Sequence, residues 1–299
     1  MKYIVDEDGI RLDVFLTNNL DESRSQILKM IKNKEVLVNG KTTKAGLNLK
    51  TGDEVEINHV KEDETIKPEK MDLDIVYEDD DVIVVNKANG VVVHPAPGNY
   101  HGTLVNGLLY HTNLSDLNGD VRPGIVHRID AYTTGLLMVA KNNKAHAILA
   151  EELAKKETYR KYVALVWGRI NNDSGTIDAP IGRSLNDRKK MAVLASGKEA
   201  ITHFKVLKRF RDATLIELEL ETGRTHQIRV HMDYIGHPVV NDPVYGNRKL
   251  IDDTGQCLHA KELGFVHPST HEYMQFDSEL SECFLNILEK FEELGDDNE

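Results

Sequence analysis

A short charged segment divides the chain into two parts of very different length. Residues 61–70 read KEDETIKPEK, with seven charged side chains in ten, a proline and one aliphatic residue, Ile66. Such a segment has too little apolar surface to belong to a core, and its composition is typical of an extended connection. The sequence therefore predicts a small module at 1–60, an acidic linker at 61–70 and a larger domain at 71–299.

The composition is that of an ordinary folded protein. Of the 299 residues, 40% are hydrophobic and 29% are charged, and the two cysteines, Cys257 and Cys283, form neither a disulfide framework nor a metal-ligand spacing. No apolar stretch approaches the ~20 residues that a membrane span requires, and the first residues lack a signal-peptide layout. We therefore expect a cytoplasmic protein without a membrane partner.

The formal net charge of −12 is unevenly distributed. Residues 61–81 and 277–299 together carry −15, so the other 255 residues sum to +3. Within these, 10–50 holds eight basic against four acidic side chains, and 183–209 holds eight against two. Solvated lysines on helix surfaces explain this pattern as well as phosphate binding does. Because phosphate binding is local, an acidic chain with basic regions remains compatible with a nucleic-acid partner.

The first sixty residues carry the patterns of two helices and a hairpin. Apolar residues at 12, 15, 16 and 20 share one helix face, and those at 27, 30 and 31 repeat this spacing after two candidate N-caps, Asp21 and Ser23. Val36–Val38 reads as a strand and runs into Asn39–Gly40, the dipeptide that most readily forms a tight hairpin turn. A last short strand ends at Ile57.

This module resembles the S4 RNA-binding domain. The resemblance rests on Arg11-Leu-Asp-Val-Phe-Leu16, Ser23-Arg-Ser25 and Val36-Leu-Val-Asn-Gly40 followed by Lys44. It implies a small α/β unit that lays its helices against structured RNA and orients it while reading little sequence. The residues that the resemblance places at the RNA are Arg11, Ser23, Arg24, Lys29, Lys34, Lys41 and Lys44.

The larger domain alternates strand-like and helix-like segments. Short apolar runs typical of buried strands lie at 82–85, 136–140 and 162–166. Helical spacing of apolar residues predicts helices at 145–153, at 228–235 and at 284–291. Residues 214–220 alternate apolar and acidic side chains, which indicates a half-exposed strand. This mixture favours an α+β fold.

Several common catalytic motifs are missing from the sequence. It contains no G-x-x-x-x-G-K-[ST], G-x-G-x-x-G, G-x-S-x-G or H-E-x-x-H, the motifs of nucleotide hydrolysis, dinucleotide binding, triad hydrolysis and zinc proteolysis. His226 and His231 are five residues apart and would lie about 140° apart around a helix, which does not suit a shared metal ion. We therefore expect no metal and no cofactor.

The segment 124–140, GIVHRIDAYTTGLLMVA, places polar residues directly before an apolar strand. Asp130 would then lie at the mouth of a core, although a loop cap with Arg128 as its surface partner explains the same pattern. Two other segments favour a site. Tyr162 begins an apolar strand, and residues 224–229 lie at a strand-to-helix junction, where backbone N–H groups and the helix dipole attract an anion.

These segments together resemble the RluA-type pseudouridine synthases, in the subgroup that acts on the large ribosomal subunit. Matching stretches extend from Asn86 to Pro268 and include HRID at 127–130, KYVALV at 161–166 and GRTHQIRVH at 223–231. The resemblance implies the pseudouridine synthase fold, with a mixed, mainly antiparallel sheet and flanking helices. It also implies a cofactor-free monomer that isomerises uridine to pseudouridine in structured RNA, with ribosomal RNA expected and transfer RNA as the alternative.

The resemblance extends to single residues. It implies that Asp130 is the essential carboxylate, that Tyr162 packs on the target uracil, and that Arg229 pairs with Asp130, with Arg224 as the alternative partner. Arg128 would fill the space left by the flipped nucleotide. The other residues expected near the substrate are His127 and Leu258.

This isomerisation needs few protein groups. The N1–C1′ bond breaks and C5 joins C1′ without redox change, so one carboxylate near C1′ could act as nucleophile, as stabiliser of positive charge or as base. An arginine within about 4–6 Å would keep that carboxylate charged. Two other functions remain open. One is an inactive RNA-binding ribosome-assembly factor, which a substitution at Asp130 or Tyr162 would have supported, although both residues are present. The other is a nucleoside hydrolase or glycosylase, which would release free base.

Overall fold

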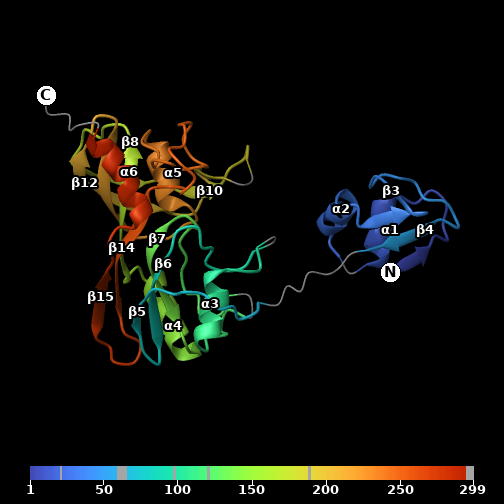
Figure 1. Ribbon diagram of the computed structural model, residues 1–299, viewed down its shortest axis with the longest axis horizontal. Helices are drawn as coiled ribbons and strands as arrows, with labels where there is room; N and C mark the ends of the chain where they lie inside the picture. The colour runs from blue at the N-terminus through green and yellow to red at the C-terminus, as the bar shows by residue number, and fades with distance from the viewer. Residues whose placement is uncertain (21, 59–65, 97–98, 120–121, 188–189, 294–299) are drawn as a thin grey trace. The chain divides into compact units, whose positions relative to one another are not determined.

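The computed structural model describes all residues except 21, 59–65, 97–98, 120–121, 188–189 and 294–299. Two units, Met1–Glu64 and Thr65–Glu299, each contain a separate apolar core (Figure 1). Residues 66–70, the second half of the predicted linker, lie against the larger unit. There Glu69 accepts a hydrogen bond from the backbone N–H of Gly102 at 2.9 Å. This part of the predicted linker therefore belongs structurally to the larger unit.

The smaller unit combines a four-stranded antiparallel sheet with two helices. The strands follow the order β1 (Lys2–Ile4), β4 (Glu54–Ile57), β2 (Val36–Val38) and β3 (Lys41–Thr42). Helices α1 (Leu12–Asn19) and α2 (Arg24–Lys32) pack with strands of this sheet in one apolar core.

The local signals of the sequence explain how this unit is built. Ser23 caps α2 in a reciprocal capping box with Gln26, as predicted, whereas the other candidate cap, Asp21, lies outside the described residues. Asn39 and Gly40 both have positive φ and join β2 to β3 in the predicted tight hairpin. Strand β1 was not predicted, because three residues are too few to show alternation.

The larger unit is built on a nine-stranded sheet. Its strands follow the order β5 (Ile75–Glu78), β6 (Val82–Lys87), β7 (Thr134–Ala140), β14 (Leu258–Val266), β8 (Tyr159–Trp167), β13 (Ala213–Leu220), β12 (Ile201–Arg209) and β9 (Ser174–Asp178), while β15 (Tyr273–Asp277) pairs with β14. All pairs are antiparallel except β7 with β14. A separate hairpin consists of β10 (Ile181–Arg183) and β11 (Met191–Val193). The expected mixed, mainly antiparallel sheet is confirmed.

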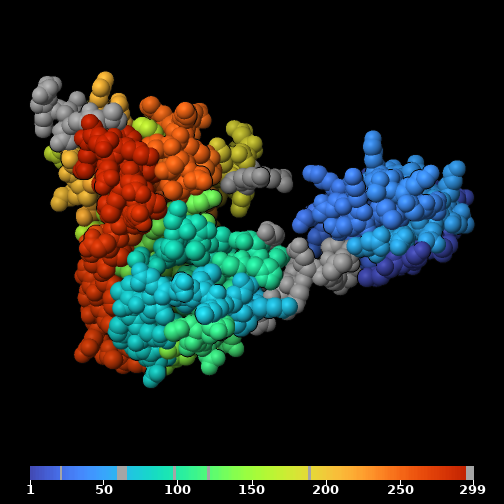
Figure 2. All heavy atoms as spheres, viewed as in Figure 1, coloured from blue at the N-terminus to red at the C-terminus, as the bar shows by residue number. Residues whose placement is uncertain are grey.

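Helices cover both faces of this sheet. Helices α3 (Leu104–His111) and α5 (Gln227–Tyr234) share a core with strand residues of one face, and α4 (Asn143–Ala154) and α6 (Glu282–Glu293) pack on the other. Strand β8 shows the alternation: Tyr162, Ala164 and Val166 belong to the first core, and Val163 and Leu165 to the core under α6. Figure 2 shows the segment that contains β15 and α6, in red, along one side of this unit.

The strand predictions succeeded where apolar residues form runs or alternate. Those at 82–85, 136–140, 162–166 and 214–220 correspond to β6, β7, β8 and β13. Strand β14 was missed because charged and small residues interrupt its sequence, LHAKELGFV. No helix in the described part of the chain is long and apolar enough to cross a membrane.

Candidate active site

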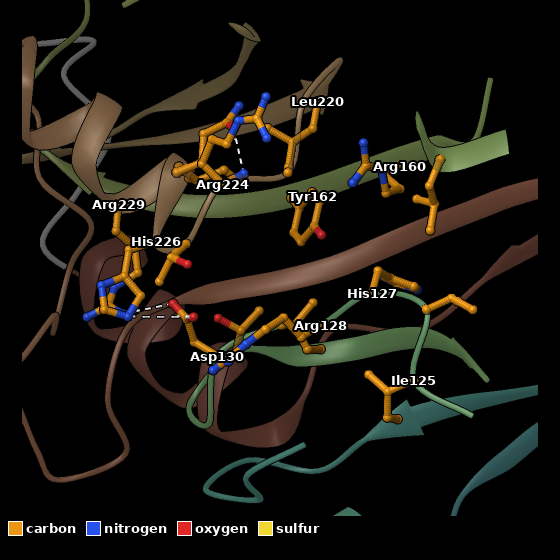
Figure 3. A pocket seen from close by; sticks show the side chains of 18 of the residues that line it. Ile125, His127, Arg128, Asp130, Arg160, Tyr162, Leu220, Arg224, His226 and Arg229 are labelled. Carbon is orange, nitrogen blue, oxygen red and sulfur yellow. Dashed lines mark hydrogen bonds and ion pairs between the residues drawn. The ribbon is translucent and has the colours of Figure 1, made fainter. Parts of the chain in front are cut away.

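A pocket of about 460 Å³ opens where the turn before β7, strand β8 and the start of α5 meet (Figure 3). Its described lining contains five arginines but one carboxylate, that of Asp130. The arginines are Arg122, Arg128, Arg160, Arg224 and Arg229. This excess of positive charge favours an anionic ligand.

Asp130 is held by Arg229, which in turn is held by a second carboxylate, Asp242. Arg229 Nη1 donates to Asp130 Oδ2 at 2.8 Å, and its Nε and Nη2 donate to Asp242 at 2.6 and 2.8 Å. The side chain of Asp130 is 17% exposed, whereas those of Arg229 and Asp242 are 4% and 0% exposed. Asp130 is therefore the accessible end of a buried ionic chain. The expected Asp130–Arg229 pair is present.

The charge of Arg229 is secure in this setting. Burial lowers the pKa of Arg229, but the hydrogen bonds and negative charges of Asp242 and Asp130 outweigh burial and raise it above the ordinary value. A guanidinium with three such bonds keeps a fixed orientation. The carboxylate of Asp130 thus meets a permanent positive charge on one side and the pocket on the other.

Hydrogen bonds to the backbone position both carboxylates that bind Arg229. Asp242 Oδ1 accepts the backbone N–H groups of Val244 and Tyr245 at 2.8 and 3.0 Å, which fixes the loop after α5. On the other side, Lys87 Nζ donates to the carbonyl of Ala131 at 2.7 Å and so ties down the residue next to Asp130.

Tyr162 and Leu258 supply the apolar part of the pocket. Both lie on neighbouring strands in the middle of the sheet, and they are 7% and 5% exposed. Burial raises the pKa of the Tyr162 hydroxyl; the charge of Arg160 opposes this shift, and that of Asp130 adds to it. Tyr162 is thus a neutral aromatic ring within electrostatic reach of both residues.

The other predicted residues that line the same pocket, Arg128, Arg224 and His127, have different partners. Arg128 is exposed, and its Nη1 lies 3.4 Å from Nε2 of His94. Arg224 Nε donates to the carbonyl of Glu199 at 2.8 Å, so the alternative pair of Arg224 with Asp130 is absent. The Arg224 alternative was wrong: the hydrogen bond to Asp130 comes from Arg229, the third residue of α5.

His127 holds the fold beside the pocket. Its Nε2 accepts the backbone N–H of Met138 at 3.1 Å, which requires an unprotonated Nε2. Burial, and then the charge of Arg160, lower the pKa of His127 to about 3, so its ring is neutral near pH 7. Its bond to β7 gives His127 a structural role that the sequence did not predict.

Three residues near this pocket were missed by sequence reasoning: Lys87, Arg160 and Asp242. Lys87 ends the apolar strand β6 and is 2% exposed. Burial lowers its pKa to about 7, while the charge of Asp130 opposes that shift. A charged residue at the end of a buried strand was the available signal for Lys87, but for Asp242 only the tertiary contact with Arg229 reveals its place.

The predicted RNA-contacting residues of the smaller unit are all exposed, although three of them also have structural contacts. Arg11 and Arg24 bind the buried carboxylate of Asp13 at 2.9 and 3.1 Å, yet keep 52% and 66% of their side chains exposed. Ser23 is the α2 cap, which explains its presence without RNA. The lysines in this exposed set are Lys29, Lys34, Lys41 and Lys44.

In the described ranges, no three His, Cys, Asp or Glu side chains are grouped as metal ligands. His226 precedes α5 with φ of 57°, and its Nδ1 lies 2.8 Å from the hydroxyl of Tyr245. His231 is buried one turn further on, where its ring bonds Thr202 and the carbonyl of Ala179. The two histidines thus serve separate hydrogen-bond networks.

A basic pocket with one held carboxylate suits an enzyme that acts on an anionic substrate. A family model described as RNA pseudouridylate synthase matches residues 81–234, and the S4 domain model matches residues 10–55. The chain belongs to the RNA pseudouridine synthase family and carries an S4 domain at its N-terminal end.

Individual relatives support this assignment. The chain is 54% identical over 289 residues to a Bacillus subtilis protein described as uncharacterized RNA pseudouridine synthase YlyB, with 95% of each chain covered. It is 41% identical over 298 residues to ribosomal large subunit pseudouridine synthase D of Escherichia coli K12, covering 94% of this chain and 90% of the other. Among solved structures, the chain is similar to the human protein named "RNA Pseudouridylate Synthase Domain Containing 1", with a TM-score of 0.59 and 25% sequence identity. The match covers 76% of this chain and 97% of the human one.

Proposed function

We propose that this enzyme converts uridine to pseudouridine in large-subunit ribosomal RNA, with Asp130 as its essential carboxylate. The observation that carries the proposal is the position of Asp130, which is partly exposed, bound to a buried arginine and part of the same pocket lining as Tyr162. The ribosomal substrate is inferred from relatives named ribosomal large subunit pseudouridine synthase D, at 40–49% identity.

The target nucleotide must leave its helix before it can react. C1′ of a stacked nucleotide is inaccessible, and extrusion costs a few kcal/mol. Stacking of the uracil on Tyr162 would return about 1–3 kcal/mol of this. Arg128, which is exposed at the pocket, is suited to fill the vacated position in the RNA.

Asp130 then acts at the sugar. The N1–C1′ bond breaks and its electron pair stays on the uracil, while the carboxylate bonds C1′, stabilises positive charge there or removes a sugar proton. After the uracil turns, C5 bonds C1′. C5 loses its proton, N1 gains one, and no atom is lost overall. Arg229 keeps Asp130 anionic for this step.

The remaining expectations are consistent with this proposal. The exposed basic residues of the S4 domain would bind phosphates and orient the RNA. The monomer that the sequence resemblance implies stays a prediction. A ribosomal RNA substrate would place the enzyme in the cytoplasm.

The test compares ribosomal RNA from a strain lacking the gene with RNA from its parent. Purified wild-type protein should restore the missing pseudouridines and release tritium from C5-labelled uridine in that RNA. Asp130→Asn should lose at least 10³-fold in rate while retaining RNA affinity.

Each alternative predicts a different result. Release of free uracil would indicate a glycosylase, and RNA binding without turnover by the wild-type protein would indicate an assembly factor. Missing pseudouridines in transfer RNA alone would contradict the ribosomal substrate. Normal turnover by Asp130→Asn would contradict the role of Asp130.

A further inference from the structure

Arg160 is a buried arginine of the pocket without a side-chain partner. It is 7% exposed, and its Nε has no hydrogen-bond acceptor. No ion pair or side-chain hydrogen bond of Arg160 occurs within the described part of the chain, whereas Arg229 in the same pocket binds two carboxylates. An arginine cannot escape this situation by losing its proton, and a buried N–H without an acceptor costs free energy. Such a group is expected to meet its partner in a ligand.

The strand fixes where Arg160 lies relative to Tyr162. The two residues are two apart on β8, so their side chains leave the same face of the sheet about 7 Å apart along the strand. The charge of Arg160 acts on both Tyr162 and His127. In Figure 3, the ring of Tyr162 lies between Asp130 on one side and Arg160 on the other.

Gly223, which also lines the pocket, lies close to this guanidinium. A Cβ at position 223 would lie 2.7 Å from Nη1 of Arg160, so a side chain there would require the end of Arg160 to shift. The lack of a side chain at Gly223 thus leaves room for Arg160 in its observed position beside Tyr162, at the same pocket.

This arrangement matches the two ends of a uridine. A nucleoside whose C1′ meets Asp130 and whose base lies on Tyr162 would direct the side of the uracil opposite N1, which carries the carbonyl oxygen O4, toward Arg160. When the N1–C1′ bond breaks, the electron pair passes to N1 and is shared with O2 and O4. Donors that face developing negative charge in a site shielded from water accelerate such a step.

We propose that Arg160 is a catalytic residue that donates to a uracil carbonyl oxygen and stabilises the uracil anion formed on cleavage. This rests on the proposed function. When the detached uracil rotates so that C5 takes the place of N1, O2 and O4 also exchange places. Arg160 therefore faces a carbonyl oxygen before and after the rotation. Arg160 thereby holds the detached base while C5 approaches C1′.

The test varies the stability of the leaving anion. A target stem-loop, identified from the gene-deletion strain, is prepared with uridine or 5-fluorouridine at the modified position. Fluorine withdraws electrons and stabilises the uracil anion without help from the protein. Single-turnover consumption of each nucleoside is measured with saturating wild-type, Arg160→Gln, Arg160→Lys and Arg122→Gln enzymes, and RNA affinity is measured separately.

Arg160→Gln should slow conversion of uridine by about 10²–10³-fold, the usual loss of one such donor, and leave RNA affinity within about twofold. The loss of rate that Arg160→Gln shows with 5-fluorouridine should be at least tenfold smaller than its loss with uridine. The rate of Arg160→Lys on uridine should lie between those of the wild-type and Arg160→Gln enzymes. Arg122→Gln, which removes an exposed arginine of the same pocket, should affect both nucleosides equally.

Equal losses of Arg160→Gln for the two nucleosides would overturn the proposal in favour of a purely structural arginine. A loss in RNA affinity and in its salt dependence, with the saturated rate unchanged, would overturn it in favour of a phosphate contact. Thermal unfolding of Arg160→Lys guards against misfolding as the cause. Failure of the wild-type enzyme on uridine would contradict the proposed function itself, and this inference with it.

Discussion

Asp242 binds Arg229 through both carboxylate oxygens, whereas Asp130 binds the same arginine through one. Asp242 also accepts two backbone N–H groups and is fully buried. The two carboxylates therefore differ in function. Asp242 anchors the arginine, and Asp130 keeps an oxygen available to the pocket.

Asp242→Asn should reduce both stability and activity. Removing one partner of a buried ion pair costs on the order of 3 kcal/mol, and Arg229 would lose its fixed orientation toward Asp130. Urea unfolding measures the first effect, and tritium release at a temperature where the variant is folded measures the second. Asp130→Asn is the matched control: it should abolish turnover with a smaller loss of stability, because Asp130 is partly exposed. Equal effects of the two variants would contradict this division.

Tyr162→Phe should have a mild effect and Tyr162→Ala a severe one. The ring is buried against the sheet, and stacking on a base contributes about 1–3 kcal/mol, a 5- to 150-fold effect. Single-turnover rates on ribosomal RNA from the deletion strain measure the difference. A Phe variant as slow as the Ala variant would indicate that the hydroxyl, which lies near the charges of Asp130 and Arg160, takes part instead.

Neutralising exposed lysines of the S4 domain should weaken RNA binding in a salt-dependent way. Replacing Lys29, Lys34 and Lys41 together by Gln removes up to three phosphate contacts, and the slope of log affinity against log salt should fall by about one for each. Lys290→Gln, on the exposed face of α6, is the control and should leave the slope unchanged. An unaltered slope in the triple variant would mean that these lysines do not touch RNA.

Stability should decrease below pH 6.5 because several histidines are buried in the neutral form. Burial lowers the pKa of His94 and His259 to about 4 and that of His127 to about 3, with nearby arginines adding to the shift at His94 and His127. Between these values and ~6.5, the unfolded chain binds more protons than the folded one. The contribution of these histidines to stability is thus complete above pH 6.5 and is lost as the pH falls, by about 1.4 kcal/mol per pH unit for each histidine.

Urea unfolding between pH 6.5 and 5 measures this slope above the range where carboxylates dominate. His259→Gln should reduce it by the share of one histidine, since Gln can replace the hydrogen bonds to Thr134 and Ser278 without titrating. If the slope of stability against pH were unchanged in this variant, His259 would bind protons between pH 6.5 and 5 in the folded protein as it does in the unfolded chain.

Local sequence determined much of the secondary structure. The capping box at Ser23 and the turn at Asn39–Gly40 depend on neighbouring backbone atoms alone, and both occur where the sequence predicts them. Apolar runs likewise predicted β6, β7 and β8, because strands buried on both faces are apolar throughout. The resemblance of HRID at 127–130 to a known motif singled out Asp130.

Only the tertiary structure decided which groups meet. Arg224 and Arg229 look alike in the sequence, and the contact with Asp130, 99 positions away, is made by Arg229, which lies within α5, whereas Arg224 precedes that helix. His127 sits in a functional motif yet supports β7. Asp242 and Arg160 carry no local signal at all. The physical reason is that hydrogen bonding and repeating apolar patterns act over a few residues, whereas charge pairing and burial depend on which distant segments the folded chain brings together.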